Sequence, residues 1–218
     1  MAGQQVPADF AAFIGSERFP CVGAKSALAL GHLEFFEAGA IALADSDAAI
    51  HAALATFGDR RAETPAMRSF ACLFRSGPVA SDHAFERQLW ARLQGLHDID
   101  ARAGAAWADR VSKDPGSPHF SMSIAGAAYF VVGLHPGAAR AARRFGRPAL
   151  IFNPHVQFEQ LRADGRYAAI QTIVRNREVS AGQGVNPMLS EFGERGEAPQ
   201  YSGRLVSADW ICPLKVRD

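Results

Sequence analysis

Two histidines follow apolar runs within residues 129–158, YFVVGLHPGAARAARRFGRPALIFNPHVQF. His135 lies in GLHP and His155 in NPH, so each imidazole comes where an apolar, strand-like run meets a proline that favours a helix start. Side chains at such strand ends point toward a cleft, and neutral imidazole is a common metal ligand. A single histidine in this setting usually bonds a nearby backbone group, but two equivalent settings favour one shared site.

A carboxylate follows the second histidine at helical spacing. Glu159 lies four residues after His155, so the two side chains share one helix face and could bind a non-haem metal together with His135. The chain contains no HExxH motif, no pair of ExxH motifs and no CxxC motif. The common zinc and di-iron patterns therefore do not apply.

Four arginines lie between the two histidines: Arg140, Arg143, Arg144 and Arg147. A solvated helix face is the usual explanation of such a run. The functional alternative is forked hydrogen bonding to carboxylates or phosphates, which is what the two carboxylates of a porphyrin require. Neither a Walker loop nor a GxGxxG motif is present, which argues against a nucleotide.

Cys21, in RFPCVGAKSAL, comes at the start of a predicted helix. The helix dipole and Lys25 would favour its thiolate there, so a nucleophile or a haem thiolate ligand is one interpretation. A small buried residue at a helix entry is the other. Cys212, in DWICPLKV, is typical of a strand core.

Three glutamates, Glu191, Glu194 and Glu197, lie in SEFGERGEAPQYSGR together with Tyr201 and Arg204. Solvated loop charges are the ordinary interpretation. A pocket for a cationic substrate, however, needs carboxylates that accept two parallel hydrogen bonds from a planar guanidinium. This loop is the densest source of such carboxylates.

Composition limits the class of protein. The 218 residues, 48% of them hydrophobic, suffice for one domain over 1–218 with a sizeable core, and the net charge of +1 provides no global attraction to nucleic acid or membrane. Three cysteines are too few for a secreted disulfide scaffold. With no leader-like start and no apolar run of about 18 residues, we expect a cytoplasmic protein.

The order of elements predicts an α+β fold, with a helix-rich N-terminal half packed on a mainly antiparallel central sheet. Helices are predicted at 22–36, 44–62 and 82–97, and from residue 154 onward with an interruption at Gly165. Strands are predicted at 68–76, at 149–153 and as two runs within 119–134 that meet at Ala125 and Gly126. Residues 1–17 are expected to form a loosely ordered arm, and 182–204 a binding or lid loop.

Five motifs resemble the YqcI/YcgG family: FPCVGAKSAL, FSMSIAGAAYFVVGLHPGAARAARRF, PALIFNPHVQFEQLR, NPMLSEFGERGEAPQYSGR and WICPL. The resemblance spans residues 18 to 214. Members of this family include haem-dependent N-hydroxylases that oxidise the guanidine group of arginine or of arginine-derived amino acids, in pathways such as guanitoxin and cycloserine biosynthesis. After LHP, relatives often carry serines before the first arginine, where this chain has GAAR.

The resemblance implies haem b as cofactor, with its iron held by an imidazole of the family motifs. His155 is the favoured ligand, since Glu159 could hold its other ring nitrogen; His135, which would otherwise lie on the distal side, is the alternative, and the Cys21 thiolate is the third. Arg140, Arg143 and Arg144 are expected to contact the propionates. Either Lys25 or Arg204 would bind the substrate carboxylate.

The implied activity is an oxidoreductase, a monooxygenase acting on a guanidine-containing amino acid with O₂ and an external electron donor. His135, Glu191 and Glu194 are its expected catalytic residues, and a homodimer is one assembly that the sequence allows. Two other functions stay open. One is a non-catalytic haem or gas-binding protein, and the other is the non-haem metalloenzyme built on His135, His155 and Glu159.

Overall fold

The computed structural model describes residues 5–60, 67–75, 77, 79–182, 184, 186–188 and 192–217. Within them the elements follow one another as α1 (Ala8–Gly15), α2 (Val22–Ala29), β1 (Leu33–Ala38), α3 (Asp47–Asp59), β2 (Ser69–Phe74), α4 (Asp82–Ala103), β3 (Met122–Ile124), β4 (Ala127–Leu134), β5 (Ala149–Pro154), α5 (His155–Ala163) and α6 (Tyr167–Ser180). Two short 3₁₀ helices, η2 (Ala141–Arg143) and η3 (Ala198–Gln200), lie in the connections. None of the described helices is both long and apolar enough to cross a membrane.

A five-stranded sheet in the order β1-β2-β5-β4-β3 forms the centre of the molecule. β1 pairs with β2 in parallel, and the other three pairings are antiparallel. Ala125 and Gly126 both have positive φ, which closes the tight hairpin between β3 and β4. The α+β class and the mainly antiparallel sheet are therefore confirmed.

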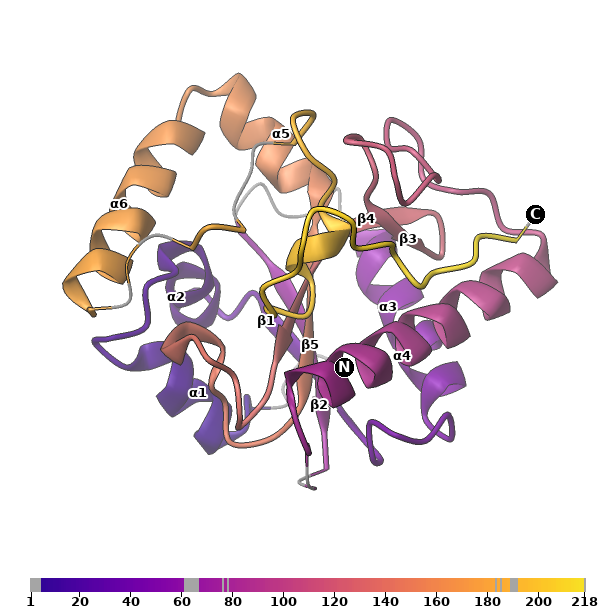
Figure 1. Cartoon of the computed structure of the whole chain (residues 1–218), viewed down its shortest axis with the longest axis horizontal. Helices are drawn as coiled ribbons and strands as arrows, with labels where there is room; N and C mark the ends of the chain where they lie inside the picture. The colour runs from indigo at the N-terminus through magenta and orange to yellow at the C-terminus, as the bar shows by residue number, and fades with distance from the viewer. Residues whose placement is uncertain are drawn as a thin grey trace.

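Helices cover both faces of this sheet (Figure 1). On one face α3 and α4 pack onto alternate residues of the strands, such as Phe70, Tyr129 and Phe152, in the larger hydrophobic core. The approach of α4 is close at Gly133, because a Cβ there would come within 2.6 Å of Phe85. The side chains of α4 therefore pack directly on the backbone of β4 at this point.

The opposite face carries α1 and α2 in a smaller core and is flanked by α6 (Figure 1). Phe10 and Ile14 of α1 are buried there against strand residues such as Leu73. Residues 8–15 are thus a packed helix and not part of a loosely ordered arm. By contrast, α6 buries only Glu178 of its 14 residues, so little apolar packing holds it.

The single helix predicted over 22–36 is wrong. The helix ends at Ala29, Gly31 turns the chain with φ +70°, and residues 33–38 form strand β1. Adjacent aromatic residues, Phe35 and Phe36, favour a strand that is covered on both faces, which a helical count of apolar spacing does not reveal. The predicted interruption at Gly165 is confirmed, since this residue has φ +70° between α5 and α6.

Candidate functional site

The two histidines lie at opposite ends of one antiparallel strand pair. His135 follows the last residue of β4, which pairs with the first residue of β5, Ala149. His155 follows the last residue of β5. Antiparallel strands place their carboxyl ends at opposite edges, about six residues or roughly 20 Å apart here. The expectation of one shared site for His135 and His155 is therefore wrong.

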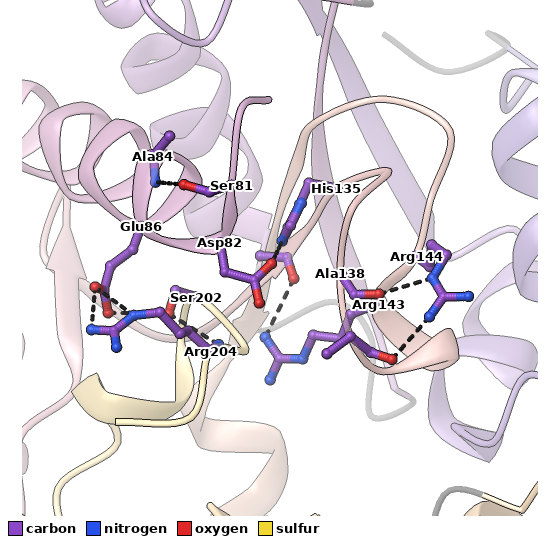
Figure 2. Close-up of polar contacts among 12 residues, drawn as sticks. Ser81, Asp82, Ala84, Glu86, His135, Ala138, Arg143, Arg144, Ser202 and Arg204 are labelled. Carbon is purple, nitrogen blue, oxygen red and sulfur yellow. Dashed lines mark hydrogen bonds and ion pairs between the residues drawn. The ribbon is translucent and has the colours of Figure 1, made fainter. Parts of the chain in front are cut away.

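His135 is buried beside the start of α4 (Figure 2). Its Nε2 lies 3.3 Å from Oδ1 of Asp82, and its ring stacks on Phe85 with the ring centroids 4.3 Å apart. Burial lowers its pKa, Asp82 opposes that shift, and Arg143 adds to it. Ser81 caps the same helix through the backbone N–H of Ala84. The imidazole thus joins the turn after β4 to the first turn of α4.

His155 lies between two carboxylates at the start of α5. Its Nδ1 is 3.9 Å from Glu159 and its Nε2 is 3.7 Å from Glu197, with Phe192 in edge contact. Nε2 has no hydrogen-bond partner among the described residues. Burial lowers the pKa of His155, Glu159 opposes the shift, and Arg162 adds to it.

Glu197 extends this buried polar chain. Ser121 and Tyr201 donate hydrogen bonds of 3.0 and 3.3 Å to its Oε2. Burial raises the pKa of Glu197 to about 7, and those two donors only partly offset it. The row of side chains formed by Glu159, His155 and Glu197 therefore joins α5 to the segment beside β3 and β4. No three described His, Cys, Asp or Glu side chains group so that they could hold a metal ion.

Two of the predicted propionate ligands bind backbone carbonyls instead. The buried guanidinium of Arg143 donates to Gly133 at 3.3 Å, Tyr201 at 2.9 Å and Gln200 at 2.9 Å. Burial lowers the pKa of Arg143 to about 10. Arg144 donates to the carbonyls of Ala138 and Ala139, and Figure 2 labels Ala138 and Arg144. Both arginines hold the turn after β4 in place.

The other two arginines face α6 and α1. Arg147 pairs with Asp9 and Glu37, each at 2.9 Å. Arg140 lies 3.1 Å from Oε1 of Glu178 and donates to the carbonyl of Gly184 at 2.9 Å. Of the four arginines, Arg140 is the one whose carboxylate partner borders a cavity.

That cavity lies between the sheet and helices α1, α2 and α6, and its volume is about 210 Å³. Its walls are mainly apolar and include Phe10, Phe13, Phe19, Phe130 and Val132. Its polar residues are Cys21, Ser69, Arg140, Arg143, Asn153, Glu178 and Asn186. The first four of the five motifs quoted above contribute to this lining. Segments far apart in the sequence therefore converge on one apolar space.

Cys21 contributes a sulfur to the cavity at the N-terminus of α2. Its Sγ accepts from the backbone N–H of Ala24 at 3.5 Å. Burial raises the pKa of the thiol, while hydrogen bonding from the backbone of Ala24 and Gly23 opposes the shift. The thiol is thus protonated at neutral pH, and a bound metal ion would displace that proton. His135 and His155 are absent from the described lining.

Glu178 is a cavity residue that the sequence did not indicate. Within YAAIQTIVRNREVS it looks like one of several solvated charges, yet it is 92% buried. Asn153 also lines the cavity, and its amide donates to the carbonyl of Phe130 and accepts from Ser69. No local pattern reveals Glu178, because its burial depends on Arg140 approaching from a distant segment.

The other residues expected to bind substrate lie elsewhere. Glu194 is exposed beside Arg195 and Trp210, and Glu191 lies outside the described residues. Lys25 donates to the carbonyl of Ser16 at 2.7 Å. Arg204 donates two hydrogen bonds, of 2.6 Å from Nη2 and 2.9 Å from Nε, to Oε2 of Glu86 on α4 (Figure 2).

The types of residue that line the cavity are those a haem needs, but the cavity is too small for a porphyrin. A haem needs an iron ligand, apolar walls and cations for its propionates, and Cys21, the aromatic walls and Arg140 are of these types. Pockets for drug-sized ligands hold about 300–1,000 Å³, so 210 Å³ accepts a ligand of amino-acid size but no whole porphyrin. The wall most easily moved is α6, of which only Glu178 is buried. Haem binding therefore requires α6 to move outward.

Comparison with known protein families gives a match over most of the chain. The model of the YqcI/YcgG family matches residues 10–215. Neither curated proteins nor solved structures match this chain. The matched range contains every strand of the sheet and every segment that lines the cavity.

Proposed function

Because the chain belongs to the YqcI/YcgG family, we propose that it is a haem-dependent monooxygenase that hydroxylates a guanidine nitrogen of arginine or of an arginine-derived amino acid. One observation supports this proposal above the others. The motifs that carry the family resemblance converge on a single apolar cavity that contains a thiol and an ion-paired guanidinium. The residue types of this lining suit a cofactor with a large apolar surface and an acidic edge, which would enter once α6 moves outward.

Cys21 is our candidate iron ligand. Of the three proposed ligands, Cys21 is the one that lies in the described cavity lining. The backbone N–H groups at the start of α2 would stabilise its thiolate. Iron binding would release the thiol proton, because only the thiolate coordinates. Arg140 is the candidate partner for a propionate, since its side chain is the cavity cation paired with a carboxylate.

When bound, a haem supplies reductive activation of O₂: one oxygen atom enters a guanidine N–H bond, and the other leaves as water with two electrons and two protons from an external donor. The aromatic residues Phe10, Phe13 and Phe130 would keep bulk water from the reacting nitrogen.

The test begins with reconstitution of the purified protein with hemin. We expect a Soret band that responds to dithionite and, with CO, takes the position typical of thiolate ligation. Cys21→Ser is expected to lose that position, whereas the matched control Cys212→Ser keeps it, because Cys212 packs on the other side of the sheet. Failure of the wild-type protein to bind hemin would sink the proposal.

Activity is tested separately from haem binding. The reconstituted protein is supplied with O₂, a reductant and L-arginine, and the product is examined by mass spectrometry for the gain of one oxygen atom. A haem-loaded protein that converts no guanidine compound would be a gas-binding protein instead. Product formation without haem would require a different cofactor.

A further inference from the structure

Glu178 is an unusual residue for the helix that carries it. The other described residues of α6 are exposed or only partly buried, but Glu178 is 8% exposed and borders the cavity. Burial of a carboxylate costs several kcal/mol unless ion pairs and hydrogen bonds compensate for the lost water. Its place on α6 therefore calls for donors that satisfy both oxygens.

Within the described part of the chain, only one of the two oxygens has a partner. Oε1 lies 3.1 Å from Nη2 of Arg140. Oε2 is buried and has no hydrogen-bond partner among the described residues. An ionised carboxylate can accept two parallel hydrogen bonds from one planar guanidinium, and Glu178 is therefore only half used.

We propose that Glu178 is the residue that recognises the guanidinium of the substrate, an inference that rests on the function proposed above. In the present structure Arg140 takes part of that position with its own guanidinium. When Arg140 turns from Glu178 to a haem propionate, both oxygens of Glu178 become available. They can then accept two parallel hydrogen bonds from the substrate guanidinium. Each charge thus exchanges one partner for another of the same sign, which avoids an unpaired buried ion.

The rest of the cavity matches such a ligand. A volume of about 210 Å³ exceeds the roughly 150 Å³ cavity that holds benzene in another protein, so an arginine-sized side chain fits the cavity as it stands. To hold a haem as well, the cavity must widen by the outward movement of α6. Apolar residues such as Ile14 and Val132 can pack on its aliphatic stem. Cys21 and Glu178 both line this cavity, which places the guanidinium receptor in the same space as the proposed iron ligand.

Calorimetric titration of the haem-loaded protein tests this without relying on turnover. The ligands are L-arginine and L-citrulline, which have equal length but differ in charge at the terminal group. The wild-type protein is expected to prefer arginine, and Glu178→Gln to bind it about 10- to 100-fold more weakly with citrulline binding little changed. Glu178→Asp should show part of the preference for arginine. The control Glu17→Gln, at an exposed residue, should keep all of it.

Separate outcomes distinguish this inference from the proposed function. The inference is overturned if Glu178→Gln binds arginine as tightly as the wild-type protein does while its haem content is full. It is also overturned if arginine affinity falls only in Glu194→Gln, or if the wild-type protein binds no arginine. If the wild-type protein binds arginine through Glu178 but forms no oxidised product, the receptor stands and the monooxygenase fails. For an active enzyme, Glu178→Gln should raise KM far more than it lowers kcat.

Discussion

His135 and His155 lie at opposite edges of the β4–β5 pair and contact different helices. The first joins β4 to α4 through Asp82, and the second lies at the start of α5 beside Glu197. A group bound to one imidazole therefore cannot reach the other. Each histidine makes its own aromatic and carboxylate contacts, with Phe85 and Asp82 around His135 and with Phe192, Glu159 and Glu197 around His155.

His135→Ala and His155→Ala are accordingly expected to retain haem. Each variant should lose about 1–3 kcal/mol in the free energy of unfolding, because each removes a buried ring with aromatic contacts. The haem-to-protein ratio and denaturant unfolding measure the two effects. Loss of haem from a fully folded His135→Ala or His155→Ala would restore that histidine as the iron ligand and remove Cys21 from the role.

Arg143→Met is expected to destabilise the fold by about 3 kcal/mol, because three buried carbonyls lose their donor. Arg144→Met is the matched control, since Arg144 binds two carbonyls of a more exposed turn and should cost less. Chemical denaturation compares the two variants. Equal, small losses would mean that the carbonyls find water, and the buried guanidinium would then need another explanation.

Much of the fold could be predicted from local patterns, but the convergence of the site could not. The hairpin at Ala125 and Gly126 and the break at Gly165 follow from short-range rules of backbone conformation. Whether two strand ends meet depends on strand direction, which apolar runs do not encode. That is why His135 and His155 seemed equivalent in sequence and are far apart in the structure.

Glu178, which the sequence did not indicate, shows the same limit of local sequence patterns. A glutamate in a polar helix is solvated unless another segment covers it, and here the cover includes Arg140, 38 positions earlier in the chain. The loop glutamates suggest a binding site in the sequence because their charges are dense. Density of charge is, however, a property of exposed segments, and Glu194 is indeed exposed.

Glu197→Gln should change how stability depends on pH. Burial raises the pKa of Glu197 from 4.5 to about 7, so between these values the folded protein holds a proton that the unfolded chain has lost. This group therefore makes the protein less stable as pH rises from 4.5 to about 7, with no further change above. The lowered pKa of His155 acts in the opposite direction, since its contribution is lost as pH falls below 6.5.

Glutamine keeps an acceptor for Ser121 and Tyr201 but does not titrate. The stability of Glu197→Gln relative to the wild-type protein should thus increase across this window, by up to a few kcal/mol. Urea unfolding at pH 4.5, 6 and 8 measures the difference, while His155 stays common to both proteins. A difference independent of pH would show that Glu197 titrates normally in the folded state.

Haem loading should displace α6 and leave α4 unchanged. The cavity of about 210 Å³ cannot enclose a porphyrin, and Glu178, with its ion pair to Arg140, is the one buried residue of α6. When Arg140 turns to a propionate, that ion pair is lost and the helix is less restrained. Hydrogen exchange measured with and without hemin should then show faster exchange in residues 167–180 and protection in α1 and α2. Unchanged exchange in α6, or protection centred on α4, would place the haem on another face of the sheet.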